Sequence, residues 1–198
     1  MKTKLVIYQV FTRTFGNKNL TKKENGTLAE NGAGKMNDFD KDVLRRIHDL
    51  GVTHLWYTGV IRHATCTDYS AFGIPTQNPR VVKGRAGSPY AITDYYDIDP
   101  DIAVDVDARM AEFEALVART HAEGMKIIID FVPNHVARQY KSIAKPQGVE
   151  DLGEDDDTGK HFDAQNNFYY CPGEQLNLSG VVENVYAHGA EAYYEFPA

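Results

Sequence analysis

The sequence predicts an α/β protein with a parallel sheet, from two observations on residues 4–132. Segments typical of strands alternate with segments typical of helices, in the order strand, helix, strand, helix, strand. Such βαβ units have parallel strands joined by right-handed crossovers. The strand segments are also continuous apolar runs, which fit strands covered on both faces better than alternating runs do.

Three segments are predicted as strands because β-branched and aromatic residues dominate them. They are residues 4–11, 53–60 and 126–132, and the third is the most hydrophobic. In parallel α/β proteins, functional residues collect at the carboxyl ends of the strands. We therefore expect a functional site among residues 11–15, 59–63 and 132–135.

Two amphipathic helices are predicted between these strands. Their apolar stripes have helical spacing and consist of Val43, Leu44, Ile47 and Leu50 in the first helix and Met110, Phe113, Leu116 and Val117 in the second. The candidate N-caps are Asp38 or Asp40 for the first helix and Asp105 or Asp107 for the second. Gly51 and Gly124 stand where the helices are expected to end, because glycine readily adopts the left-handed conformation common there.

The remaining segments lack a clear period. Residues 16–36 are predicted as a loop, residues 62–89 as irregular structure and residues 97–100 as a turn. Helical spacing ends after Ala137, and residues 161–198 hold eight aromatic residues punctuated by Gly and Asn. We expect two parts: an α/β unit at residues 1–136 and a β-rich or irregular insertion at residues 137–198.

Composition excludes several classes of protein. The chain has 198 residues, of which 42% are hydrophobic, the profile of an ordinary soluble protein with one core. Its formal net charge of −7 argues against a nucleic-acid-binding surface. No apolar run approaches about 18 residues, so no membrane-spanning helix is predicted. The amino terminus has no signal-peptide pattern, so we expect a cytoplasmic protein with free thiols at Cys66 and Cys171.

An acidic block at residues 150–157 supplies most of the negative charge. A block of this kind is typical of a solvated loop. An EF-hand calcium loop is not supported, because Gly159 and Lys160 stand where that motif needs Asp or Asn followed by Gly.

A phosphate-binding motif is present only in part. Gly32-Ala33-Gly34-Lys35 suggests a P-loop, but Ala29 and Met36 occupy the positions that require Gly and Ser or Thr. A phosphate-binding α/β module is therefore disfavoured, and a flexible loop is expected there. No Gly-x-Ser-x-Gly elbow supports a serine hydrolase, and the seven His residues do not cluster at metal-ligand spacing.

The run Asp130-Phe131-Val132-Pro133-Asn134-His135 is unusual at the end of an apolar strand. A buried carboxylate without a partner costs several kcal/mol, so Asp130 needs hydrogen-bond donors nearby. Two interpretations follow from the chemistry. Asp130 and His135 either make structural hydrogen bonds or contribute polar groups to a functional site.

This run, with Asp130-x-x-x-Asn134-His135 after a hydrophobic strand, resembles the first conserved segment of the α-amylase family of glycoside hydrolases. Four more segments are similar to the family in order and spacing. They are the first barrel strand at residues 8–11, the approach to the second strand at 50–56, a Tyr-x-x-x-Asp-Tyr-x-x-x-Asp-Pro element at 90–100 and the approach to the third strand at 121–126. The resemblance covers residues 4–135, two thirds of the chain.

The resemblance implies the first three strands of a (β/α)₈ TIM barrel, with residues 137–198 as the insertion, domain B, that the family places after the third strand. It implies action on an α-glucan or maltooligosaccharide by a retaining mechanism, in which one carboxylate attacks the anomeric carbon and a second protonates the leaving oxygen. The family carries these carboxylates on later strands, and no Arg-x-Asp segment replaces them here. The chain alone is therefore expected to be an inactive part of such an enzyme.

The resemblance also implies roles for five residues. Tyr90 would offer an aromatic face to the sugar, and His135 would donate a hydrogen bond to one of its hydroxyls. Asp130 and Asp94 would support the active site. Asn134 would lie at the domain B junction, where many members of the family hold calcium, so calcium is the one cofactor expected.

Two positions depart from the family pattern. Ala91 stands where α-glucosidase-like members often have Asp, which disfavours an enzyme that acts on chain ends, and Pro89 replaces the usual Gly. The alternative hypothesis is a non-catalytic carbohydrate-binding or scaffolding protein on a partial barrel. In either case the strand at residues 126–132 would lack its next neighbour in a lone chain, and open sheet edges predict self-association.

Overall fold

The computed structural model describes residues 4–173 and 193–195. Its principal elements, in chain order, are β1 (Ile7–Phe11), α1 (Leu28–Asn31), α2 (Lys41–Asp49), β2 (His54–Thr58), β3 (Ile61–His63), β4 (Ile92–Ile98), α3 (Arg109–Ala122), β5 (Lys126–Ile129), β6 (Tyr169–Cys171) and β7 (Tyr193–Glu195). Short 3₁₀ helices lie at Met36–Asp38, Ser70–Phe72, Pro79–Val81 and Pro100–Ile102.

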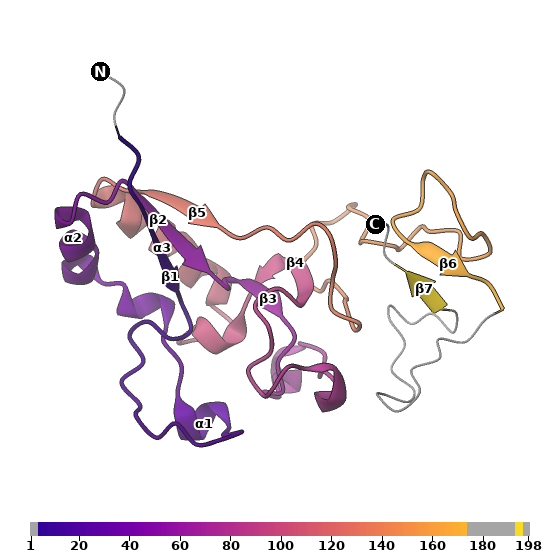
Figure 1. Cartoon of the computed structure of the whole chain (residues 1–198), viewed down its shortest axis with the longest axis horizontal. Coiled ribbons are helices and arrows are strands. Elements are labelled where there is room, and N and C mark those ends of the chain that lie inside the picture. The colour runs from indigo at the N-terminus through magenta and orange to yellow at the C-terminus, as the bar shows by residue number, and fades with distance from the viewer. Residues whose placement is uncertain (1–3, 174–192, 196–198) are drawn as a thin grey trace.

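The three predicted strands form one parallel sheet in the order β1–β2–β5 (Figure 1). Tyr57 in the central strand pairs with Val10 on one side and with Ile129 on the other. The predicted parallel α/β arrangement is therefore confirmed, with strands shorter than the apolar runs. The sheet is open: within the part of the chain that the structure describes, β1 and β5 each pair with β2 alone.

The first helix, α2, begins as predicted at Asp40, whose Oδ1 accepts a hydrogen bond from the backbone N–H of Val43 at 2.8 Å. Gly51 follows its end with φ +84°, the left-handed conformation expected there. Leu50 does not belong to the buried stripe, since it is 73% exposed.

The predicted N-caps of α3 are wrong, whereas Gly124 follows its end with φ +80° as predicted. Its N-cap is Ala108, which makes no side-chain cap hydrogen bond. The Glu112 carboxylate instead reaches back and accepts from the backbone N–H groups of Val104 and Asp105 at 2.7 to 3.0 Å. A carboxylate in the first turn also interacts favourably with the helix dipole, so Glu112 does the work expected of Asp105 or Asp107.

The core lies between the central strand and the two long helices. Leu55 and Tyr57 of β2 are fully buried, together with Leu44 of α2 and Leu116 of α3. Phe39 packs edge-on against Tyr57, with ring centroids 4.9 Å apart. The Tyr57 hydroxyl and Thr120 Oγ1 lie 2.9 Å apart, which satisfies two buried polar groups and ties α3 to the sheet.

The prediction that both faces of the sheet are covered is wrong for the described residues. Ile7 on β1 is 53% exposed, and Phe131, just after β5, is 70% exposed. Phe131 contacts Tyr95 of β4, with ring centroids 5.7 Å apart, but most of its ring stays exposed. The open sheet thus presents apolar side chains at both of its edges.

A second sheet was missed, whose strands lie at either end of the segment predicted as irregular, residues 62–89. β3 pairs with β4 in an antiparallel hairpin whose long connection runs from residue 64 to residue 91. Asp97 lies inside β4 rather than in a turn. The chain that follows the predicted functional run then lies along β4: Ala137 N–H donates to Ile92 O at 2.7 Å, and Lys141 N–H donates to Thr93 O at 3.0 Å. β4 therefore fixes the position of residues 137–141, which follow the parallel sheet.

The predicted β-rich insertion is described only in part. β6 and β7 form an antiparallel pair at the end of the molecule opposite α2 (Figure 1). The aromatic residue Tyr186 and most of the chain after residue 173 lie outside the described residues. The boundary at residues 136 and 137 and the identity of the insertion as domain B stay predictions. None of the helices in the described part of the chain is long and apolar enough to cross a bilayer.

Candidate functional site

Asp130 joins the carboxyl ends of two neighbouring strands. It follows β5 directly, and its Oδ1 accepts a hydrogen bond from Trp56 Nε1 of β2 at 2.7 Å. Its Oδ2 accepts from the backbone N–H of Gly59, just beyond β2, at 3.1 Å. The carboxylate thus has the donors that its partial burial requires, and it orients the indole at this end of the sheet.

Tyr90 lies close to the same end of β2. Gly59 has φ +75°, and a Cβ built there would lie 3.0 Å from Phe11 Cε2 and 3.1 Å from Pro89 Cβ. Glycine is therefore required at this position both for its backbone conformation and for the close approach of the chain before Tyr90. The Tyr90 side chain is 41% exposed, which leaves ring surface open to a ligand.

His135 and Asn134 are exposed and contact each other, with His135 Nδ1 2.8 Å from Asn134 Oδ1. An amide oxygen only accepts, so in this arrangement Nδ1 carries the proton and Nε2 is left for a ligand. The Tyr95 hydroxyl donates to the carbonyl of Val132 and lies 3.3 Å from the carbonyl of His135. β4 therefore clamps the turn that presents the imidazole.

Asp94 is fully buried and acts as an anchor between segments. Its two oxygens accept five hydrogen bonds, from Arg62 Nη2 (3.0 Å), Tyr96 N–H (2.9 Å), Ser142 Oγ (2.7 Å), Ile143 N–H (2.8 Å) and Ala144 N–H (3.2 Å). The side chain therefore ties β4 to the start of the predicted insertion. It has no exposed atom to offer a ligand, so any role in a site acts through the segments it holds.

Three further carboxylates, Asp97, Asp99 and Asp101, were given no role from the sequence, although Asp99 belongs to the family element at residues 90–100. All are at most 3% exposed. Arg109 binds Asp97 with two hydrogen bonds of 2.7 and 2.9 Å. Tyr69 donates to Asp101 at 2.6 Å. With Asp94 they form a row of four aspartates along β4 and the turn after it.

Asp99 pairs with a histidine inside this row. His63 Nδ1 lies 3.1 Å from Asp99 Oδ2, and both side chains are buried. Burial raises the pKa of Asp99 to about 6, with the nearby His63 and Arg13 opposing the rise and the Asp101 carboxylate adding to it. The sequence signal that could have found these residues is the Asp-x-x-Asp-x-Asp-x-Asp spacing, but their partners lie far away in the chain.

The acidic block at residues 150–157 is not simply a solvated loop, and this prediction is wrong in part. Asp151 is buried and accepts from Tyr140 OH and Ser142 N–H, each at 2.8 Å. Asp156 accepts from the backbone of Asn167 and Phe168 at 2.8 and 2.9 Å. These carboxylates join segments of residues 140–170 next to the buried aromatic residues Tyr140, Phe168 and Tyr170.

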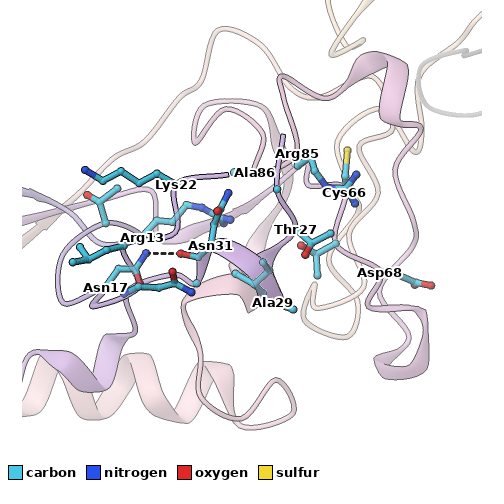
Figure 2. A pocket seen from close by; sticks show the side chains of 17 residues that line it. Arg13, Asn17, Lys22, Thr27, Ala29, Asn31, Cys66, Asp68, Arg85 and Ala86 are labelled. Carbon is cyan, nitrogen blue, oxygen red and sulfur yellow. Dashed lines mark hydrogen bonds between the residues drawn. The ribbon is translucent and has the colours of Figure 1, made fainter. Parts of the chain in front are cut away.

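Two large cavities are lined by described residues, of about 670 Å³ and 530 Å³. The first lies beside α1 and includes Arg13, Asn31, Cys66 and Arg85 in its wall (Figure 2). The second lies between residues 75–77 and 139–154. Neither wall contains Tyr90, Asp130 or His135.

Calcium has few ligands to bind near Asn134. Its Oδ1 already contacts the His135 ring. Among residues 4–173, no group of three or more His, Cys, Asp and Glu side chains is placed to hold a metal ion. Calcium prefers six to eight oxygen ligands, and the side chains present do not supply such a cage.

A family model described as the α-amylase catalytic domain matches residues 9–177. The chain belongs to the α-amylase family. The match includes Tyr90, Asp94, Asp130 and His135, and it confirms the family that the sequence motifs indicated. It also agrees with the open parallel sheet, since a partial TIM barrel has its first strands side by side in this order.

Relatives in the α-amylase family include enzymes named for glucan chemistry. The chain is 29% identical to maltase 1 of Drosophila virilis over 74% of its own length and 18% of the relative. It is 25% identical to a cyclomaltodextrin glucanotransferase of Bacillus sp. (strain 17-1) over 91% of its own length and 25% of the relative. A solved α-amylase structure from Lactobacillus plantarum shares 30% identity with a TM-score of 0.46, covering 68% of this chain and 24% of that chain. The chain therefore spans a quarter or less of the length of these relatives.

Proposed function

We propose that the chain forms the amino-terminal part of a retaining glycoside hydrolase that acts on α-linked glucans, and that it contributes to the sugar site rather than the reacting carboxylates. The strongest support is the family match over residues 9–177, which includes the segment from Asp130 to His135. Relatives named maltase and cyclomaltodextrin glucanotransferase indicate the substrate class.

In the proposed site, Tyr90 and His135 touch the sugar. The exposed part of the Tyr90 ring would pack on a pyranose face, because sugar rings present C–H groups that suit an aromatic surface. His135 would use Nε2 toward a hydroxyl group, since Nδ1 is occupied by Asn134. A neutral ring accepts through Nε2, and a protonated ring donates through it.

Asp130 and Asp94 support this site without touching the substrate. Asp130 would keep the Trp56 indole and the Gly59 turn in place beneath the sugar, through its two hydrogen bonds. Asp94 would fix residues 142–144 and so the chain that leaves His135. Groups held in this way lose little entropy when the substrate binds.

The nucleophile and the general acid would come from outside these 198 residues. A retaining enzyme places two carboxyl groups about 5 Å apart across the scissile bond. Asp130 and Asp94, the described aspartates nearest the proposed site, each accept hydrogen bonds on both carboxylate oxygens. Neither carboxylate is therefore free to attack or protonate a sugar. The 198-residue chain alone is therefore expected to release no reducing sugar from starch, and steady release that a substitution within it abolishes would contradict this assignment.

Binding of maltotriose tests the proposed sugar site directly. Isothermal titration calorimetry would compare Tyr90→Ala with Tyr96→Ala, since both tyrosines are similarly exposed, at 41% and 37%, and lie six residues apart. We expect Tyr90→Ala to weaken binding by about tenfold, the loss of one stacked ring, and Tyr96→Ala to leave it unchanged. Equal effects of the two substitutions, or none, would remove Tyr90 from the site.

The open edges of the parallel sheet are expected to associate with other strands. An unpaired strand edge offers free N–H and C=O groups, and Phe131 adds exposed apolar surface beside β5. In the complete barrel, further strands would take these positions, whereas in the isolated chain a second copy would.

A further inference from the structure

The cavity beside α1 has a built wall that the proposed sugar site does not use. It has a volume of about 670 Å³ and is formed by residues 13–32, 66–68 and 85–86 (Figure 2). This volume lies within the range of about 300 to 1,000 Å³ that is typical of small-molecule sites.

The wall is cross-linked by amide side chains, although residues 16–36 were predicted as a loop and the glycine-rich part as flexible. Asn17 Nδ2 donates to the carbonyl of Asn31 at 3.0 Å, and Asn19 Nδ2 donates to the carbonyl of Glu30 at 2.9 Å. Thr27 and Glu30 form a reciprocal capping box at the start of α1. A pocket with this preformed wall loses little conformational entropy on binding.

Cationic side chains outnumber carboxylates in the wall of this cavity, with Arg13, Lys22 and Arg85 against Asp68. Arg13 has a side chain only 15% exposed, and it uses one of its five N–H groups, toward the buried Asp101. The Arg85 guanidinium makes no hydrogen bond to a described residue. The pKa of Glu30 is lowered chiefly by Lys23 and Thr27, and the nearby Arg85 adds a small contribution of the same sign. Asp68 is the one carboxylate in the wall, and Figure 2 shows it at the opposite end of the group from Lys22.

We propose that this cavity binds a small molecule carrying a phosphate or carboxylate group. Guanidinium groups match such anions because two parallel N–H groups can bind two oxygens at once, in charge-assisted hydrogen bonds. Arg13 is held in place by Asp101, and Arg85 by its backbone carbonyl, which accepts from Cys66 N–H at 2.8 Å. The apolar side chains of Leu20, Leu28 and Ala86 in the same wall suit a sugar-sized organic body.

This anion site goes beyond the proposed function and shares no residue with it. Tyr90, Asp94, Asp130 and His135 are absent from the cavity wall, and neutral glucans carry no anionic group. The two proposals can therefore fail separately: maltotriose tests the sugar site, and the ligands below test the cavity.

Cys66 provides a readout inside the cavity. Its thiol lies in the wall beside Arg85, whereas the other cysteine, Cys171, lies on β6 at the far end of the molecule (Figures 1 and 2). Alkylation of Cys66 would be followed by mass spectrometry with glucose 6-phosphate, glucuronate or glucose present, and Cys171 would serve as the internal reference. We expect the phosphate or the carboxylate ligand to slow labelling of Cys66 alone, and glucose to have no effect.

Charge-removing substitutions test which side chains hold the anion. Arg85→Gln should weaken binding of the protecting ligand by about tenfold or more, the usual loss for a charge-assisted hydrogen bond. Arg46→Gln on the exposed face of α2 removes the same charge outside the cavity and should leave the affinity unchanged. Higher salt should also weaken binding of the anion, because exposed charges are screened.

A second pair of variants decides the question if Arg85→Gln does not fold. Lys22→Met changes an exposed lysine of the cavity wall, and Lys18→Met changes an exposed lysine of the same loop outside it. A weaker anion affinity in Lys22→Met alone supports the proposal. The proposal is overturned if neither anion protects Cys66, if glucose or maltotriose protects it equally, or if the folded cavity variants bind the anion as tightly as their controls.

Discussion

The parallel sheet and the β3–β4 hairpin distribute burial in opposite ways. At the edges of the sheet, the apolar residues Ile7 on β1 and Phe131 just after β5 are more than half exposed. In the hairpin and the turn after it, Asp94, Asp99 and Asp101 are fully buried. The segments whose composition is most typical of a core thus expose apolar side chains, whereas the segment whose composition is typical of a polar turn buries its carboxylates.

The difference shows which forces hold each region. The sheet is held by backbone ladders and by the apolar contacts of Leu55 and Tyr57 with the two helices. The hairpin is held by carboxylates that bind Arg62, Arg109 and His63. Buried charges of this kind cost desolvation energy and are stable only when each one keeps its partners. Loss of one carboxylate should therefore be more harmful than loss of one exposed apolar residue.

The largest effect is expected for Asp94→Ala. It removes the acceptor of five hydrogen bonds and leaves Arg62, which is 2% exposed, without its closest ion pair. The free energy of unfolding should fall by about 3–5 kcal/mol, as for other buried ion pairs broken on one side. Urea denaturation measures this change, with Asp107→Ala, an exposed aspartate, as the control. A loss below about 1 kcal/mol would show that the hairpin does not depend on this carboxylate.

A smaller effect, with a defined pH dependence, is expected for Asp99. The pKa of Asp99 is about 6 in the folded protein and near 4 in an unfolded chain, so the folded state binds more protons between these values. The contribution of Asp99 to stability is therefore present below about pH 4 and is lost as the pH rises through about 6. The stability of the wild type relative to Asp99→Asn should fall by on the order of 1–3 kcal/mol across this window. A difference that stays flat or rises with pH would contradict the assignment.

Substitution of the predicted N-cap residues should lower the unfolding free energy at α2, where Asp40 is the N-cap, but not at α3, where Ala108 is. Asp40→Ala removes the bond to Val43 N–H and should cost about 0.5–2 kcal/mol of unfolding free energy. Asp107→Ala, the other cap that the sequence predicted for α3, should change the unfolding free energy by less than about 0.5 kcal/mol, because Ala108 rather than Asp107 begins α3 and the Asp107 side chain is exposed. Thermal unfolding of the two variants makes the comparison, and equal losses would mean that the geometry at one of the two helices is misassigned.

The smallest effect on stability is expected at the open edge of the sheet. Phe131→Lys should change the unfolding free energy little, since the ring is 70% exposed, but it should reduce self-association of the isolated chain. Phe162→Lys is the matched control, because Phe162 is 63% exposed and lies away from the parallel sheet. Sedimentation velocity over a range of concentrations measures the association. Equal association of both variants would exclude the sheet edge as the contact.

The sequence predicted the sheet, both long helices and the family, because these depend on local periodicity and on motifs of neighbouring residues. It did not predict β3, since only three residues form that strand and its partner begins at Ile92. It did not predict the partners of the buried aspartates because those partners are distant: Arg62 lies 32 residues from Asp94, and Arg13 lies 88 residues from Asp101. No period in the sequence reports which of many charged residues will meet in space.

For the candidate site, the sequence indicated the residue types and their end of the sheet, but not their contacts. Nothing local in the run from Asp130 to His135 indicates that Trp56 would bind the carboxylate or that Asn134 would occupy the imidazole. The acidic block illustrates the same limit, since Asp151 is buried by Tyr140 and Ser142 rather than solvated. Contacts between segments decide the role of a polar residue, whereas composition decides only its chemistry.

The central claim is that Tyr90 and His135 face one sugar. Nuclear magnetic resonance of the chain labelled in its Tyr and His rings would follow both residues during a maltotriose titration, with the exposed rings of Tyr96 and His48 as references. We predict that the Tyr90 and His135 signals shift together with one dissociation constant, while the reference rings do not move. Shifts that saturate at different concentrations, or no shift at either ring, would contradict a shared site.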